Sequence, residues 1–433
     1  MRLTGWGRKP AVDAEVFAPY SIPDLRSRFP RARFRGIPRG NGRSYGDSAL
    51  APQVLSSRRL DRFLAFDAET GVLRCEAGVL LADILDVFVP RGWFLHATPG
   101  TKLISVGGAI ASDVHGKSHH LEGCFSRHVE RFSLMLADGG IVDCSTTQHA
   151  DLFRASCGGM GLTGFILEAT LRLKRIRSAY LRETTFKADD LDHALSLFAE
   201  QSGAPYSVAW IDCLATGPRL GRSLLMTGDF IDDGRLHGIA KTPLSVPVDA
   251  PGFALNRYSV AAFNALYYHR VRGRQRERVV HFDPFFYPLD GIGHWNRIYG
   301  KSGFTQYQFV IPKASGAAGI EEVLQRIAAS KRGSFLAVLK TFGPANGNPL
   351  SFPMEGYTLA LDFRLEPGLL PFLEELDRIV LDHGGRLYLT KDVRMSAETF
   401  RAGYPRWKEF QDLRRKYGAD TTFRSLQSER LGL

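Results

Sequence analysis

The chain has 433 residues, of which 44% are hydrophobic and 23% are charged, and its formal net charge is +11. This composition predicts a globular protein of two or three domains and excludes a disordered chain, while the basic charge favours anionic partners. Five cysteines without a C-x-x-C pair argue against a disulfide framework or structural zinc and predict a reducing compartment.

Short strands and helices alternate irregularly over the first 178 residues. The N-terminal twenty residues lack the apolar segment of a signal peptide, and no run predicts a membrane span, so we expect a cytoplasmic protein, soluble or held at the surface of the inner membrane. The irregular order disfavours a doubly wound sheet and predicts an α+β region. We expect helices at 22–30, 80–92 and 149–159, strands at 62–67, 72–78 and 165–176, and a hairpin over 132–145 with Asp138-Gly139 at its turn.

The pattern changes after residue 178, where longer strands at 307–312 and 358–363 and helices near 319–331 and 369–383 predict a second α+β domain. Between the two lies the segment 236–281, which has little periodicity. We expect it to be a mobile, structureless basic loop, either solvated or touching an anionic lipid surface. Its end carries five arginines: Arg270, Arg272, Arg274, Arg276 and Arg278.

A glycine-rich motif, RGNGRSYGD, occupies residues 39–47. Its three glycines allow positive φ angles and close approach of the backbone to a ligand. Successive N–H groups in such a loop can bind a phosphate, and Arg39 and Arg43 would add charge. A tight surface turn is the alternative interpretation.

Two further motifs contain small residues. TPGTK (98–102) precedes VGGAIASD (106–113), which leaves room for a flat ligand against the backbone. His115 follows and fits a redox or acid–base role, or a place in the core. His115, His119 and His120 have no carboxylate or cysteine pattern nearby, so we expect no metal.

GGMGLTG (158–164) contains G-x-G-x-x-G, but it follows a helix and opens a strand, the reverse of the NAD-binding arrangement. It fits a stretch lying against a nucleotide pyrophosphate instead.

Taken in order, the three motifs resemble the FAD-binding fold of the vanillyl-alcohol-oxidase (PCMH) type. The blocks RGNGRSYGD, PGTKLISVGGAIASDVHGKSHH, GGMGLTG, FTQYQFVIP, LSFP and GGRLYLTKD resemble decaprenylphosphoryl-β-D-ribose 2′-oxidases over nearly the whole chain. The resemblance implies a two-subdomain FAD-binding domain formed by 1–178 and 387–433, and a substrate domain, 179–386, with an antiparallel sheet. Arg43 stands where the wider superfamily often has a histidine that carries FAD covalently, so non-covalent FAD is implied.

The resemblance also assigns roles to individual residues. The implied catalytic residues are Lys391, Tyr45 and His115. The implied substrate-binding residues are Lys117, Trp210, Gln306, Gln308, Lys340, Phe342, Thr358 and Ala360. The implied cofactor-binding residues are Arg39, Gly40, Asn41, Gly42, Arg43, Ser44, Tyr45, Gly46, Pro99, Gly100, Thr101, Val106, Gly107, Ala109, Ser112, His115, Gly116, Gly161, Gly164, Ile166 and Lys391.

Oxidation of a secondary alcohol requires a hydride to leave carbon and a proton to leave oxygen, so it needs positioning and a nearby base. Lys391 can be that base only if desolvation or neighbouring cations lower its pKa. It could instead hold the anionic reduced flavin, or pair with Asp392 or Asp362 for structure. Tyr45 would assist a proton relay or order its loop.

The activity implied by the resemblance is FAD-dependent oxidation of the 2′-hydroxyl of a polyprenyl-phosphoryl ribose to a 2′-keto sugar. A separate NAD(P)H-dependent reductase would complete the epimerisation to the arabinose form used in cell-envelope polysaccharide. Mycobacterial members have cysteine, asparagine and tyrosine where this chain has Ala360, Thr358 and Phe286, so an FAD oxidase of a soluble alditol, aldose or sugar lactone is the alternative. We expect no nucleic-acid partner, because no zinc knuckle, basic helix or RNP-like strand is present.

Overall fold

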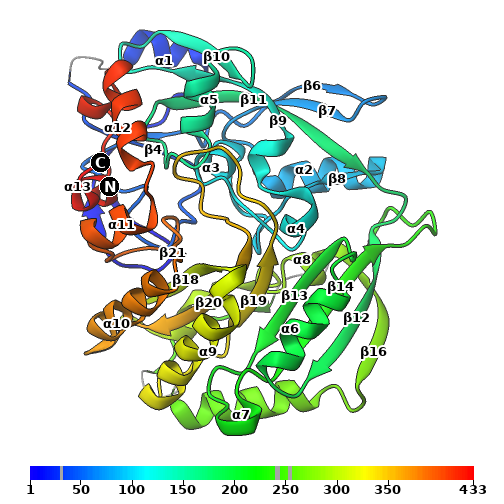
Figure 1. The fold of residues 1–433 in the computed structure, drawn as a ribbon. Helices are drawn as coiled ribbons and strands as arrows, with labels where there is room; N and C mark the ends of the chain where they lie inside the picture. Colours follow the sequence, from blue (N-terminus) through cyan, green and yellow to red (C-terminus); the bar gives the residue numbers. More distant parts are fainter. Residues whose placement is uncertain (30–32, 239–243, 252–255) are drawn as a thin grey trace.

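The computed structural model describes residues 1–29, 33–238, 244–251 and 256–433. Two large sheets dominate it, one in each half of the molecule, and the two chain ends lie close together beside the first of them (Figure 1). Helices and mainly antiparallel strands are mixed, which confirms the predicted α+β class.

The first large sheet has six strands, all paired antiparallel. Five follow the order β10–β9–β11–β7–β6, and β8 pairs with the end of β11. The predicted hairpin over 132–145 is confirmed as β9 and β10. The strands are β6 (Phe63–Asp67), β7 (Val72–Glu76), β8 (Trp93–Leu95), β9 (Val129–Met135), β10 (Ile141–Ser145) and β11 (Phe165–Arg175).

A small parallel sheet, β3–β5–β4, and the pair β1–β2 form the N-terminal part of the same half. A backbone bridge joins Gly36 to Phe423, so the C-terminal segment completes this part of the fold. The strands are β1 (Arg2–Thr4), β2 (Ala11–Asp13), β3 (Glu15–Phe17), β4 (Gly36–Arg39) and β5 (Gln53–Ser56).

The second large sheet is antiparallel throughout, in the order β16–β12–β14–β13–β19–β20–β18–β21, as the resemblance implied. Helices α6, α9 and α10 pack on one of its faces (Figure 1). The strands are β12 (Tyr180–Ala188), β13 (Tyr206–Ile211), β14 (Ser223–Phe230), β16 (Gln275–His281), β18 (Phe304–Pro312), β19 (Ala337–Phe342), β20 (Gly356–Arg364) and β21 (Arg386–Leu387); β15 (Leu244–Ser245) and β17 (Ile292–Gly293) pair apart from it.

Five helices of the described residues correspond to predicted ones, namely α1, α2, α5, α9 and α10, and the other helices, among them α3 in the small-residue run after Ser105, were not predicted. They are α1 (Ile22–Arg28), α2 (Leu81–Phe88), α3 (Val106–Ala111), α4 (His119–Glu122), α5 (Ala150–Ser156), α6 (Leu191–Glu200), α7 (Arg257–His269), α8 (Phe282–Phe286), α9 (Lys313–Ser330), α10 (Leu369–Asp382), α11 (Ala397–Gly403), α12 (Trp407–Lys416) and α13 (Leu426–Leu431). Short 3₁₀ turns are η1 (Val89–Arg91), η2 (Phe125–His128), η3 (Gly217–Arg219), η4 (Trp295–Tyr299) and η5 (Ala419–Thr421).

The prediction that 236–281 lacks regular structure was wrong. The segment contains α7 and the edge strand β16, while its residues 239–243 and 252–255 lie outside the described part of the chain. β16 forms because its basic side chains find acidic partners: Arg278 lies opposite Glu183 in the β12 register and pairs with it at 2.8 Å. Pairing of opposite charges between strands that are far apart in sequence cannot be predicted from one short segment.

We propose the domain division that the sequence suggested, with 1–178 and 387–433 on one side and 179–386 on the other. Every strand of the eight-stranded sheet lies between residues 180 and 387, and β21 straddles the boundary. All five cysteines are free and buried. Within the described residues, no helix combines the length and apolar character needed to cross a bilayer.

Candidate active site

A cavity of about 700 Å³ is enclosed jointly by the loops of the first half and the eight-stranded sheet of the second. This volume falls in the range of about 300–1,000 Å³ that is usual for small-molecule and cofactor sites. The three glycine-containing motifs reach it from separate parts of the sequence: residues 38–45, 98–117 and 160–166 all contribute to its lining.

Strand alternation turns one face of the second sheet into the cavity wall. In β18, Gln306 and Gln308 line the cavity, whereas Tyr307 and Phe309 between and beyond them are buried in the core under the helices. Successive side chains of a strand point to opposite faces, so the sequence FTQYQF assigns polar residues to the cavity and aromatic ones to the core.

The strand register then assembles a row across four neighbouring strands. Gln308 lies opposite Ala360, Ala360 opposite Val338, and Val338 opposite Trp210. The indole of Trp210 donates to the carbonyl of Phe335 at 3.1 Å, which fixes the ring. This row is a flat, mostly apolar wall with a single amide at one end.

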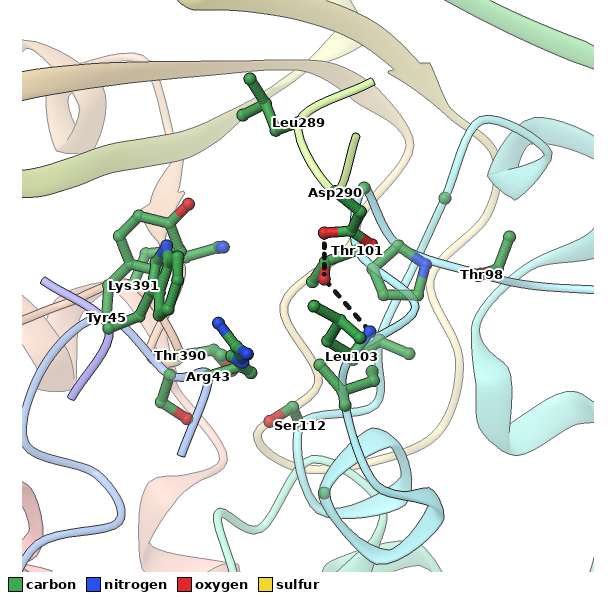
Figure 2. A pocket seen from close by; sticks show the side chains of 18 of the residues that line it. Arg43, Tyr45, Thr98, Thr101, Leu103, Ser112, Leu289, Asp290, Thr390 and Lys391 are labelled. Carbon is green, nitrogen blue, oxygen red and sulfur yellow. Dashed lines mark hydrogen bonds between the residues drawn. The ribbon is translucent and has the colours of Figure 1, made fainter. Parts of the chain in front are cut away.

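Arg43 supplies a free cation at the glycine-rich end of the cavity (Figure 2). Its guanidinium lies 4.1 Å from the centroid of the Trp6 ring and makes no hydrogen bond or ion pair with the described residues. Opposite, Asp290 accepts hydrogen bonds from Thr101 Oγ1 and the Lys102 amide, both at 2.8 Å. An unpaired guanidinium offers five donors, which suits phosphate oxygens.

Two glycines of the region 98–117 show how its backbone approaches a neighbouring segment and the cavity. A Cβ on Gly116 would lie 2.1 Å from the carbonyl oxygen of Thr98, so only glycine lets these two segments pass. A Cβ on Gly100 would meet no atom within 4 Å, because the residue faces open space in the cavity. The first glycine is required by packing and the second leaves room for a ligand.

His115 presents an unsatisfied donor. Its Nε2 lies 3.1 Å from the Gln308 amide nitrogen and accepts a hydrogen bond from it, which leaves the ring proton on Nδ1. That Nδ1 is buried without a hydrogen-bond partner. Burial, with the charges of Lys340, His119 and Lys391, holds the pKa of His115 well below its usual value, so the ring is neutral. A buried donor of this kind calls for an acceptor on a bound molecule.

Three buried lysines line the same cavity. Burial and the nearby charge of Lys340 lower the pKa of Lys117 to about 7, and burial lowers that of Lys340 to about 8. Lys117 Nζ donates to the Phe285 carbonyl, but Lys340 Nζ has no hydrogen bond or ion pair to any described residue. Desolvated ammonium groups without counter-ions make this end of the cavity a site for an anion.

Lys391 is the third of these lysines. Its Nζ lies 3.8 Å from the centroid of the Tyr45 ring, and it has no ion pair with a described carboxylate (Figure 2). Asp392 pairs with Arg430 at 2.8 Å, and Asp362 accepts from Gln306 at 2.6 Å. Burial, reinforced by Lys340 and opposed by Asp362, lowers the pKa of Lys391 to about 7. The condition for a lysine base is therefore met by its surroundings.

Comparison with known proteins identifies the family. Residues 15–145 match the FAD binding domain family. The chain is 38% identical to the decaprenylphosphoryl-β-D-ribose oxidase of Mycolicibacterium smegmatis, over 100% of this chain and 97% of that protein.

This chain belongs to the decaprenylphosphoryl-β-D-ribose oxidase family.

More distant relatives share less. An uncharacterised Streptomyces coelicolor protein is 32% identical over 82% of this chain and all of its own length. The L-gulonolactone oxidase of Bos taurus is 29% identical over 45% of this chain and 46% of its own. Family membership and the domain match make the chain an FAD-dependent oxidoreductase.

The cavity of this family member fits FAD. The free guanidinium of Arg43 suits the pyrophosphate, the open space at Gly100 admits a ligand beside the backbone, and His115 Nδ1 lacks an acceptor. When bound, FAD supplies a hydride acceptor.

Most residues that the sequence analysis assigned to the site line this cavity, and five do not. Phe342 packs edge-on against His115 at 4.7 Å, and Thr358 hydrogen-bonds the Gln308 amide, so both lie behind the wall and position residues that face the cavity. The remaining three lie in the packing around it: Gly46, Val106 and Ala109.

The sequence analysis missed many lining residues, and one group of them comes from the segment 284–295. Asp290, Leu289 and Trp295 reach the cavity from the loops after α8, where no glycine motif or periodic pattern marks them. Glu183, Met226 and Tyr267 were also missed. Strand alternation around the predicted Trp210 is the signal that could have found Val208, which lies two residues earlier on β13 and also lines the cavity.

Proposed function

We propose that this oxidoreductase converts the 2′-hydroxyl of a polyprenyl-phosphoryl ribose to a 2′-keto sugar, with FAD held non-covalently. The observation that carries the substrate class is the cluster of Lys117 and Lys340, two buried cations facing the cavity without a described carboxylate partner within ion-pair distance. A phosphorylated substrate would compensate this charge, whereas a neutral alditol would leave it desolvated and unpaired.

In the proposed reaction, Lys391 takes the hydroxyl proton. Its Nζ, whose pKa burial lowers to about 7, lies in the cavity beside Tyr45, while Gln306 and Gln308 on the sheet wall would bind sugar hydroxyls. His115 donates from Nδ1 to an acceptor on the ligand, and its ring orientation is fixed by Gln308 and by Phe342. Arg43 replaces the residue type able to bond FAD covalently, which supports non-covalent binding.

The proposal is tested by recording the flavin absorption of the purified holoenzyme under anaerobic conditions. We expect polyprenyl-phosphoryl ribose to bleach the flavin band and free alditols, aldoses or sugar lactones to leave it unchanged. Bleaching by a free sugar alone would contradict the substrate class. Precipitation with acid should release the flavin into the supernatant; a flavin that stays with the protein would contradict non-covalent binding.

A soluble alditol, aldose or sugar lactone remains the second candidate substrate, and the composition of the sheet wall favours it. Ala360, in the wall, and Thr358, behind it, stand where the resemblance implies cysteine and asparagine in mycobacterial members. The similarity to a lactone oxidase covers less than half of each chain, which makes this the weaker alternative.

Ala360 also predicts that the protein resists a class of covalent inhibitor. Reagents that bond covalently to the cysteine of the mycobacterial members should not modify this protein, because Ala360 has no thiol and burial raises the pKa of each of its five cysteines. Ala360→Cys should gain one adduct per chain in intact-protein mass spectrometry. An adduct on the unsubstituted protein, located by peptide mapping to the cavity, would contradict the expectation.

We further propose that the lipid-linked substrate is met at an anionic membrane surface and that a separate NAD(P)H-dependent reductase consumes the keto product. Tyr258 and Leu266 on α7 are 69% and 75% exposed, and the arginines 272 and 276 on and beside the edge strand β16 are exposed as well. Because Tyr267 and Arg270 of the same region line the cavity, this face would bring the lipid headgroup to the cavity entrance.

A further inference from the structure

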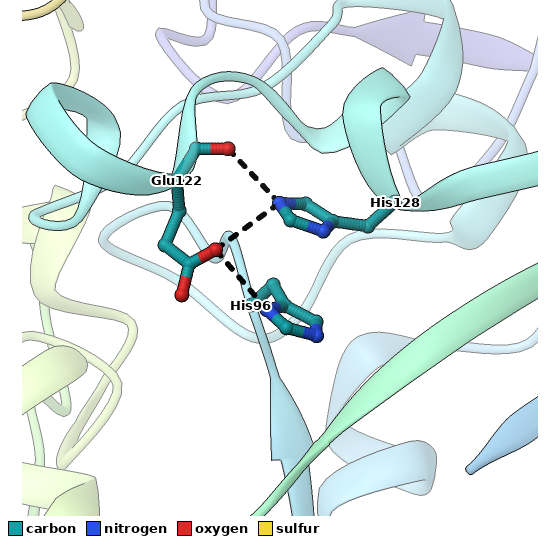
Figure 3. A group of neighbouring side chains, drawn as sticks. All are labelled: His96, Glu122 and His128. Atoms are coloured by element: carbon teal, nitrogen blue, oxygen red, sulfur yellow. Dashed lines mark hydrogen bonds and ion pairs between the residues drawn. The ribbon is translucent and has the colours of Figure 1, made fainter. Parts of the chain in front are cut away.

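Two histidines and a glutamate meet outside the cavity, on elements that the reaction does not use (Figure 3). His96 follows β8, Glu122 ends α4, and His128 ends the turn η2. One ligand atom from each lies within 4.8 Å of the other two. His96 Nδ1 is 3.2 Å and His128 Nε2 is 3.8 Å from Glu122 Oε2, and the two rings stack at 4.2 Å with an angle of 2° between them.

These separations suit a metal ion. Ligand atoms about 2.0–2.1 Å from a tetrahedral zinc ion lie about 3.3–3.4 Å from one another, and the two nitrogen–oxygen distances bracket that value. Binding requires the two rings to turn out of their parallel stack, so that both nitrogen lone pairs point at the ion, and His128 Nε2 to leave the Glu122 carbonyl to which it now donates at 3.0 Å. The imidazole proton would then sit on Nδ1.

The residues around Glu122 also resemble those around a metal-binding carboxylate. Lys174 Nζ lies 3.4 Å from Glu122 Oε1, the oxygen that an ion on Oε2 would leave free, and outer partners of this kind orient metal-binding carboxylates. Lys174, Arg127 and Arg172 add positive charge nearby, which weakens binding without blocking it. The side chains are 13–25% exposed, so water can complete the coordination.

We propose that His96, Glu122 and His128 bind one divalent transition-metal ion, with Zn²⁺ as the probe, and with water in the remaining position. The site joins the residue that follows β8 to Glu122 and His128 of the segment 119–128. That segment follows directly on His115 and Lys117, so the ion would act as a structural tie behind this part of the cavity wall.

The test is calorimetric titration of the chelator-treated holoenzyme with Zn²⁺. We expect one equivalent bound by the wild-type protein and a rise in melting temperature, and loss of both in His96→Gln and in His128→Gln. His383→Gln is the matched control, since it removes a histidine 2.9 Å from Glu322 that has no third ligand; it should bind like the wild type.

The flavin absorption band shows whether each variant is folded. If both histidine variants lose the flavin band, zinc-edge X-ray absorption of the wild-type protein tests the proposal in their place. We expect two imidazoles and a carboxylate around the ion. No Zn²⁺ uptake by the wild type at micromolar concentration, unchanged uptake in the folded histidine variants, or sulfur ligands at the zinc edge would overturn the proposal.

Discussion

Replacing Lys391 by methionine should slow reduction of the flavin by substrate by about 10²–10⁴-fold, the usual contribution of a general base. The expectation rests on a buried Nζ beside Tyr45 that has no described ion-pair partner and a pKa lowered to about 7. Anaerobic stopped-flow spectroscopy measures the rate, and the FAD content of the variant shows whether the cavity is intact. Lys313→Met, at an exposed lysine, is the control.

The pH dependence separates the two roles of Lys391. A base must be unprotonated, so the rate for the wild type should rise with pH through about 7 and then level, while the Lys391→Met rate stays flat over that interval. Asp362 interacts electrostatically with Lys391, so the midpoint of the pH–rate profile reflects the titration of both residues. Lys391→Arg keeps the charge but holds its proton, with a pKa above about 12. Wild-type rates in that variant would contradict the base role and favour stabilisation of the reduced cofactor.

Replacing Arg430 by methionine should lower the free energy of unfolding by about 3–5 kcal/mol, the usual cost of leaving a buried charge without its partner. Arg430 pairs with Asp47 at 2.9 Å and with Asp392 at 2.8 Å, and both carboxylates are almost fully buried. Chemical denaturation followed by flavin and tryptophan fluorescence measures the change. Arg415→Met, which breaks an exposed pair with Asp412, should cost little.

The sign of the pH effect follows from the two carboxylates. Burial opposes ionisation of Asp392, but Arg430 and Arg394 outweigh it and lower its pKa, so its contribution to stability is present above its unfolded pKa and is lost as pH falls. The pKa of Asp47 is raised by burial despite Arg430, so its ionisation costs stability at neutral pH. In Arg430→Met both charges lack the guanidinium, and the deficit should be largest near neutral pH and shrink in acid. A deficit independent of pH would indicate lost packing instead.

Local patterns predicted the parts of the site that depend on local geometry. The glycine motifs were found because a backbone that must approach a ligand, or pass the Thr98 carbonyl as Gly116 does, restricts residue type at single positions. Gln306 and Gln308 were assigned through the family resemblance, and the alternation in FTQYQF explains why both face the cavity.

What the sequence did not reveal depends on long-range pairing. Asp290 accepts a hydrogen bond from the Lys102 amide across 188 residues, and Arg430 reaches Asp47 across 383 residues. Strand β16 was misjudged for the same reason, since its stability comes from Glu183 on another strand. The order of the eight strands, which puts Ala360 between Gln308 and Val338, is a property of register that no single segment carries.

The position of Lys391 and Arg430 in the chain has a consequence for biosynthesis. Because both follow the entire eight-stranded sheet in sequence, a ribosome must translate the intervening domain before Lys391, which lines the cavity, and Arg430, which pairs with Asp47, emerge from the exit tunnel. The glycine-rich loop is synthesised early. Until the C-terminal segment is complete, the Tyr45 amide lacks the Thr390 carbonyl that accepts its hydrogen bond, and Asp47 lacks the Arg430 guanidinium. Cofactor capture should therefore be a late, post-translational event, and nascent chains stalled before residue 390 should not retain FAD.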